Sequence, residues 1–171
     1  MIYNLKDNRT GKETKFTTTV DVKLLDKTIV FDFNCKDSDF YCANEGYNTN
    51  LYDGDVCEAF ICVDGSRENY FELEVAPNNS VFFKRVHNPK SGKRTSFEMV
   101  NSVKSSVTKN GRDYTVHLEV PLSSLGWDEK TRIIFNAYRI ETEGGETNKN
   151  LLAVNPTLSD TYHKPEFFIE L

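Results

Sequence analysis

Two charged residues stand inside otherwise apolar stretches, and there the sequence could place polar chemistry. Glu58 interrupts the apolar residues of 56–62, and Arg139 interrupts those of 137–140. A buried carboxylate needs a cationic or hydrogen-bonding partner, because its uncompensated burial is costly. Two interpretations are open: an internal ion pair between Glu58 and Arg139, or a polar cluster at the floor of a concave binding site.

Aromatic side chains gather where the pattern predicts loops. Tyr41, Tyr47 and Tyr52 fall in one long polar segment, and Tyr162 and His163 precede the last expected strand. A flat ring face suits the C–H surface of a pyranose, and carboxylate or amide oxygens can accept hydrogen bonds from its hydroxyls. Exposed tyrosines also occur on surfaces that bind nothing, so a sugar site and a plain surface both stay open.

The signatures of common enzyme classes are missing from the sequence. It contains no Gly-x-Ser-x-Gly, no phosphate-binding glycine loop and no His-Glu-x-x-His. The histidines His87, His117 and His163 are far apart in the sequence, and His117 is interpreted as a solvent-facing strand residue. Glu72 and Glu74 could flank a glycosidic bond, but this spacing on a strand is typical of a polar face. We therefore expect no catalytic activity.

The four cysteines lack the spacing and the neighbouring histidines of a zinc site. Cys57 and Cys62 lie on one expected strand with an odd separation, which points them to opposite faces. Buried free thiols are the favoured interpretation for these two. Whether Cys35 and Cys42 pair with each other stays open.

Charge and hydropathy exclude two kinds of partner. Acidic residues outnumber basic ones, 26 to 21, and no basic run exceeds two residues, which argues against nucleic acid. The longest apolar stretches, 59–63 and 151–154, are far shorter than the roughly 20 residues of a membrane-spanning helix. The N-terminus does not resemble a signal peptide. We expect a soluble monomer, cytoplasmic if the chain is complete and extracellular if it was cut from a larger secreted protein.

Strand-like alternation with turn signals between the strands recurs along the chain, without a long helical pattern. About nine short strands of this kind indicate an all-β fold, an antiparallel β-sandwich, and residues 1–171 fit one domain. The expected strands are 16–23, 29–35, 56–63, 70–75, 81–83, 100–108, 114–120, 132–140 and 167–171. Residues 36–55 and 87–95 are expected to be loops, and loops as long as the first often carry function.

Five segments resemble motifs of the family 9 carbohydrate-binding modules and occur in the order of that family. They are Leu51–Phe60 (W-x-D-D-x-x-E-x-F), Asn69–Asn78 (Y-x-x-F-E-x-N-x-x-G), Val120–Gly126 (I-P-x-x-x-L-G), Phe135–Arg139 (F-N-x-x-R) and His163–Phe168 (H-x-P-x-x-F-G). Each motif is short, and the ordered set is what makes the resemblance specific.

The resemblance implies a jelly-roll-like β-sandwich that binds a glycan without catalysing a reaction. In that family two aromatic side chains clamp a terminal sugar, and the two positions fall on Tyr52 and Tyr162. Sugar-binding members have Trp at both, so an alternative is a protein-interaction or scaffold domain that has lost the sugar site. Glu58 matches the acidic residue that accepts hydrogen bonds from the sugar hydroxyls.

Further ligand-binding positions implied by the resemblance are Asn136, Arg139 and His163, with Arg139 orienting Glu58 or donating to a sugar oxygen. Members of the family also bind structural calcium, and acidic side chains supply the hard oxygen ligands that Ca²⁺ prefers. The residues suggested for a calcium site are Asp37 and Asp39, or Asp53 and Asp55.

Overall fold

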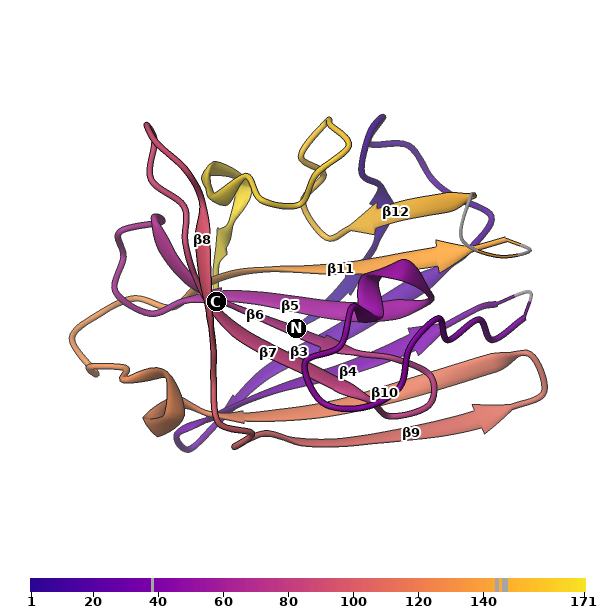
Figure 1. Cartoon of the computed structure of the whole chain (residues 1–171), viewed down its shortest axis with the longest axis horizontal. Helices are drawn as coiled ribbons and strands as arrows, with labels where there is room; N and C mark the ends of the chain where they lie inside the picture. Colours follow the sequence, from indigo (N-terminus) through magenta and orange to yellow (C-terminus); the bar gives the residue numbers. More distant parts are fainter. Residues whose placement is uncertain (38, 144, 146–147) are drawn as a thin grey trace.

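Two antiparallel sheets pack face to face in a β-sandwich (Figure 1). The protein is represented by a computed structural model that describes residues 1–37, 39–143, 145 and 148–171. The smaller sheet has the order β1-β3-β4-β10-β9. Its strands are β1 (Ile2–Asn4), β3 (Thr18–Leu25), β4 (Thr28–Cys35), β9 (Lys104–Asn110) and β10 (Asp113–Pro121).

The larger sheet has the order β2-β12-β11-β5-β6-β7-β8, and β13 also pairs with β11. Its strands are β2 (Lys6–Asp7), β5 (Val56–Cys62), β6 (Asn69–Val75), β7 (Val81–His87), β8 (Thr95–Glu98), β11 (Ile134–Thr142), β12 (Lys149–Ala153) and β13 (Ile169–Glu170). The helical segments are the short 3-10 turns η1 (Leu51–Asp53), η2 (Leu122–Leu125) and η3 (Pro165–Phe167). Across the described residues, no helix has the length and apolarity needed to span a bilayer.

The prediction of an antiparallel β-sandwich is confirmed, but the described residues contain thirteen strands rather than about nine. β1 and β2 have three residues or fewer, too few to show an alternating pattern, whereas β13 falls within the expected strand 167–171. β8 is exposed at every residue and begins inside the predicted 87–95 loop. β12 ends in an apolar run that does not alternate. The described part of residues 36–55 has no strand, as expected, and ends in η1.

Alternate residues of the larger sheet face two separate apolar clusters. Cys57, Ala59 and Ile61 of β5 point inward, where they join the core between the sheets. Phe60 and Cys62 point outward into a second cluster. The expectation that Cys57 and Cys62 lie on opposite faces is therefore confirmed.

All four cysteines are free thiols. Across the core, Sγ of Cys57 lies 3.5 Å from Sγ of Cys35. The neighbour of Cys35 is thus Cys57 and not Cys42, which is only half-buried.

The outer face of the larger sheet is covered by the segments that carry η1 and η3. Leu51 of η1, together with Tyr162 and Phe168 near η3, packs into the second apolar cluster. The rings of Phe60 and Tyr70 stack there with centroids 5.5 Å apart. These covering segments leave one part of the sheet open, and that part forms a pocket.

Candidate functional site

A pocket of about 540 Å³ lies on the outer face of the larger sheet. Strands β5 to β8, β11 and β12 supply most of its lining. The chain around η1 and before η3 supplies most of the rest, together with Arg9 after β2 and Arg94 before β8. In Figure 1, η1 is the violet turn beside β5. Polar residues that line the pocket include Tyr52, Glu58, Glu72, Glu74, Lys84, Arg94, Lys149, Tyr162 and His163.

Three carboxylates from adjacent strands form what we term the outer cluster: Glu58 of β5 and Glu72 and Glu74 of β6. Glu58 lies directly opposite Glu74 in the strand register. Glu72 shares their face because it is two residues from Glu74. One oxygen from each of the three lies within 4.8 Å of the others, so the carboxylates converge on one point.

The outer cluster is buried. Glu74 is fully buried and Glu58 is 2% exposed. Burial, and next the charge of Glu72, raises the pKa of Glu58 well above its ordinary value. Burial, together with the charges of Glu58 and Glu72, does the same to the pKa of Glu74. Burial raises the pKa of Glu72 to about 7, although Arg94 and Lys84 oppose this shift.

Both predicted clamp tyrosines line the pocket, but their surroundings differ. Tyr52 is 39% exposed and contacts Phe82 edge to face with ring centroids 6.4 Å apart. Tyr162 is only 6% exposed, and its ring stacks on Tyr138 at a centroid distance of 4.1 Å. The hydroxyl of Tyr162 donates to the carbonyl of Arg139 and accepts from the amide of Leu152, which locks the side chain. Only Tyr52 is left with an accessible ring.

His163 also lines the pocket, as the resemblance suggested. Its Nδ1 shares a hydrogen bond of 2.7 Å with the hydroxyl of Tyr70, and its Nε2 lies 3.6 Å from Oε1 of Glu72. Burial, and then the charge of Arg94, lowers the pKa of His163 to about 3. The imidazole is therefore neutral at pH 7.

Arg139 lies on the opposite face of the sheet, and its predicted ion pair with Glu58 is wrong. In the register of β5 and β11, Glu58 stands opposite Tyr138 and Arg139 opposite Cys57. Successive strand residues point to opposite faces, so Arg139 points inward and Glu58 outward. Both residues are described, and neither pairs with the other.

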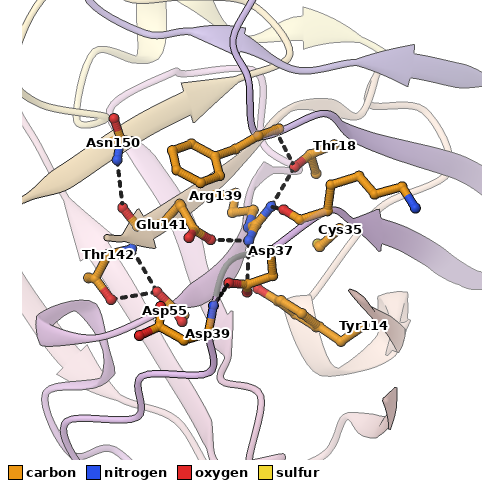
Figure 2. Close-up of polar contacts among 12 residues, drawn as sticks. Thr18, Cys35, Asp37, Asp39, Asp55, Tyr114, Arg139, Glu141, Thr142 and Asn150 are labelled. Atoms are coloured by element: carbon orange, nitrogen blue, oxygen red, sulfur yellow. Dashed lines mark hydrogen bonds and ion pairs between the residues drawn. The ribbon is translucent and has the colours of Figure 1, made fainter. Parts of the chain in front are cut away.

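The guanidinium of Arg139 instead stands among inward-facing polar groups (Figure 2). It donates to Oγ1 of Thr18 at 2.9 Å and to the carbonyl of Lys36 at 2.7 Å. It pairs with the carboxylates of Asp37 and Glu141, and all three of these side chains are fully buried. Arg139 therefore joins the two sheets and the loop after β4.

Asn136 is fully buried and does not line the pocket. Its side chain donates to the carbonyl of Asn155 at 2.8 Å and accepts from the amide of Asn155 at 3.1 Å. This pair of hydrogen bonds fixes the chain that leaves β12. The structure thus assigns Asn136 to the fold, and the ligand role suggested for it has no geometric support.

A family model describes carbohydrate family 9 binding domain-like proteins, and it matches residues 2–171. The chain belongs to this family. The resemblance drawn from five short motifs is thereby confirmed. Among curated proteins no sequence matches the chain.

Solved structures share the fold of this family 9 domain at low identity. A Bacteroides uniformis protein to which carbohydrate binding is attributed superposes with a TM-score of 0.79 at 14% identity, covering 100% of this chain and 85% of that one. A family 9 module from Caldicellulosiruptor kristjanssonii has been solved with glucose, with a TM-score of 0.67, 13% identity and coverage of 98% and 82%. The structure of a family 9 module from the same organism with cellotriose has a TM-score of 0.67 and 14% identity, and the match covers 98% of this chain and 80% of that one.

The calcium ligands suggested for this family 9 domain do not group as expected. Asp53 is half-buried and pairs with Nζ of Lys149 at 3.4 Å, whereas Asp55 is fully buried. Asp55 accepts hydrogen bonds from the amides of Tyr41 and Thr142 at 2.7 Å each. The two aspartates therefore do not share one site.

Asp55 lies instead with Asp37 and Glu141, in what we term the inner cluster. One oxygen from each of these three carboxylates lies within 4.8 Å of the others. Arg139 pairs with two of the three, and a guanidinium remains charged at any accessible pH. The positive charge that a calcium ion would bring is already supplied, so the inner cluster does not fit calcium. Asp39 stands beside it and donates its amide to Asp37 at 3.0 Å.

Glu72 and Glu74 are the site residues that sequence reasoning missed. They alternate with Phe71, Leu73 and Val75, the pattern of a strand whose second face is in water. In this family 9 domain β6 lies between β5 and β7, and both of its faces are covered. The available signal was the position of β6 directly after β5, its natural antiparallel neighbour, which is apolar on both faces apart from Glu58.

Proposed function

We propose that this domain binds a carbohydrate noncovalently in the outer-face pocket and catalyses no reaction on it. The observation that carries the proposal is an accessible tyrosine ring in the same pocket as convergent buried acceptors. Tyr52 offers a π-face for the C–H surface of a sugar ring. The outer cluster offers acceptors for sugar hydroxyls.

Cationic donors complete the polar lining of the pocket. Lys84, Arg94 and Lys149 all contribute to it. Nζ of Lys149 lies 6.0 Å from the ring centroid of Tyr52. A hydroxyl-bearing ligand stacked on Tyr52 would therefore meet donors as well as acceptors. The pocket volume of about 540 Å³ falls within the range of small-molecule sites.

Family membership supports this function, and so does the fold shared with a module that has been solved with glucose and cellotriose. The acid geometry argues against glycoside hydrolysis. In glycosidases the two catalytic carboxyl groups flank the scissile bond about 5 to 9.5 Å apart. Here the three carboxylates converge within 4.8 Å on one side of the pocket. We infer that Tyr52 alone stacks on the sugar, while Tyr162 forms part of the wall.

Calorimetric titration with mono- and oligosaccharides, glucose and cellotriose included, tests the proposal. We expect binding in the micromolar to millimolar range, about −8 to −4 kcal/mol, and at least a tenfold loss in Tyr52→Ala. Tyr47→Ala is the matched control, because Tyr47 lies in the same loop, is 41% exposed and does not line the pocket. Absence of binding to every sugar by the folded protein would favour the scaffold alternative instead.

A further inference from the structure

The outer cluster buries three carboxylate oxygens, from Glu58 and Glu74, without giving them a partner. Oε1 of Glu58 and both carboxylate oxygens of Glu74 are buried and accept no hydrogen bond. Glu74 is fully buried and lines the pocket, so its carboxylate faces the cavity. A buried polar atom left without a partner is uncommon in native proteins and costs stability. Such atoms indicate a missing ligand.

The positions of Glu58 and Glu74 sharpen this conclusion. They stand directly opposite each other on adjacent strands, where like charges destabilise a sheet. Lys84 is the cross-strand neighbour of Glu72, yet its Nζ lies over the ring of Phe82, 4.5 Å from the centroid. Across the described residues, the only ion-pair contact to the outer cluster is His163 at 3.6 Å.

The inner cluster shows how three buried carboxylates are compensated elsewhere in the molecule. There Arg139 pairs with Asp37 and Glu141, and the amide of Thr142 donates to Asp55 (Figure 2). The amide of Tyr41 also donates to Asp55. On the pocket side, no lysine or arginine of the described residues forms an ion pair with the outer cluster. The difference is an ion-paired cation, which none of the described residues supplies to the outer cluster.

We propose that Glu58, Glu72 and Glu74 hold a divalent cation of the calcium type, which binds the carbohydrate by accepting two of its neighbouring hydroxyls as ligands. The inference rests on the proposed function and specifies its chemistry. The ligand is a sugar with a vicinal diol, and its two hydroxyls coordinate the metal ion.

The geometry of the outer cluster suits this ion. Calcium binds oxygen ligands at about 2.3–2.6 Å, so two oxygens on one ion lie at most about 5 Å apart. The three carboxylate oxygens lie within 4.8 Å of one another. Calcium accepts 6–8 oxygens in flexible arrangements. Three monodentate carboxylates therefore leave positions that open into the cavity, where sugar hydroxyls or water can complete the shell.

Calcium titration of the whole chain tests the site directly. The protein is stripped with EDTA, dialysed, and titrated with CaCl₂ by calorimetry, with the shift in melting temperature measured in parallel. We expect one calcium per chain and at least a tenfold weaker affinity in Glu74→Gln. Glu170→Gln is the matched control, because it removes one charge from an exposed position on the same sheet, outside the pocket. The wild-type melting shift needs no variant and keeps the test decisive if Glu74→Gln misfolds.

Sugar titrations in calcium and in EDTA separate this inference from the proposed function. At least tenfold weaker binding of glucose or cellotriose in EDTA supports the metal bridge. Equal affinity in both buffers overturns it and leaves the proposed function intact. A third outcome is that the wild type binds one calcium per chain, that Glu74→Gln loses this calcium, and that the wild type binds no sugar. That outcome supports the cation site and overturns the proposed function.

Two further results would overturn the cation site itself. One is the absence of both heat and melting shift with CaCl₂ at up to about 1 mM, the weak end of natural calcium sites. The other is binding of glucosamine in EDTA that Glu74→Gln abolishes, which would assign the outer cluster to an ammonium group of the sugar.

Discussion

Three buried carboxylates converge on each side of the larger sheet, and the two clusters differ in the partners that they have. The inner cluster (Asp37, Asp55 and Glu141) surrounds a guanidinium and accepts hydrogen bonds from backbone amides. No lysine or arginine of the described residues forms an ion pair with the outer cluster, and three of its oxygens have no partner. Both clusters therefore consist of buried acidic side chains, and they differ in whether those side chains have a cationic or hydrogen-bonding partner. A compensated cluster holds the fold together, whereas an uncompensated one at a cavity indicates a ligand.

Removing the inner cation should have the largest effect. Arg139→Met leaves the buried carboxylates of Asp37 and Glu141 without their ion-pair partner, and breaking a buried ion pair typically costs about 3–5 kcal/mol. We expect a loss of this size in the free energy of unfolding, measured by urea denaturation. Arg132→Met is the control, since Arg132 is exposed and its pair with Glu170 should contribute at most about 1 kcal/mol. Equal losses in the two variants would remove the distinction between the clusters.

The same substitution in each cluster should change stability with opposite sign. In EDTA, Glu74→Leu removes a buried carboxyl without a partner and should raise the free energy of unfolding by about 1–3 kcal/mol. Glu141→Leu leaves Arg139 short of a counter-charge and should lower it by a similar or larger amount. Urea denaturation of both variants at pH 7 measures the two effects. A loss of stability in Glu74→Leu would contradict the view that the outer cluster is uncompensated.

The gain in Glu74→Leu should also depend on pH. The pKa of Glu74 is raised in the folded protein by burial and by its acidic neighbours. The folded state therefore retains a proton that the unfolded chain releases above about pH 4.5, so the wild type loses stability as the pH rises through the raised pKa. In EDTA, Glu74→Leu should gain more at pH 8 than at pH 5. A gain that is equal at both pH values would contradict the assignment.

The two pocket tyrosines offer a smaller contrast of the same kind. Tyr162→Phe removes a hydroxyl that donates to the carbonyl of Arg139 and leaves the buried amide of Leu152 without an acceptor. Stability should fall by about 1–2 kcal/mol, while sugar affinity stays within threefold of the wild type. Tyr52→Ala should instead lower the sugar affinity and change the stability little, because the ring of Tyr52 is accessible. A tenfold loss of sugar affinity in Tyr162→Phe would restore Tyr162 as a ligand residue.

Much of the fold followed from sequence patterns, and the gaps have physical causes. Alternation predicted β3, β4, β6 and β10, because each of these strands is long enough to show a period of two. β2 has two residues, and its existence depends on pairing with β12, which the local sequence does not encode. β8 is exposed at every residue and carries no apolar pattern at all.

The site was predicted less well because register decides which face a side chain takes. Glu58 and Arg139 both stood out as charges in apolar strands, but a shift of one residue in pairing moves a side chain to the other face. The pairing of Arg139 with Cys57 is a long-range fact. Glu72 and Glu74 looked like a solvated face because their burial depends on neighbouring strands and covering loops. A charge inside an apolar strand thus predicts that a partner exists, but not on which side of the sheet it lies.

An exposed cluster on the smaller sheet tests whether burial is what separates the two clusters. His117 contacts Asp32 at 2.6 Å and Glu119 at 3.2 Å, and its side chain is 42% exposed. The hydrogen bond to Asp32, outweighing partial burial and aided by Glu119, raises the pKa of His117. The stabilisation is fully present below about pH 6.5 and is lost as the pH rises through the raised pKa.

Because water screens this exposed cluster, its contribution should stay below about 1 kcal/mol. His117→Gln should remove the pH dependence and change the free energy of unfolding at pH 8 hardly at all. His87→Gln is the control, since His87 is exposed and lacks a carboxylate partner among the described residues. Melting temperatures at pH 5.5 and 8 measure the difference. An effect as large as that of Arg139→Met would mean that proximity of charges matters more than burial, and the contrast between the inner and outer clusters would lose its basis.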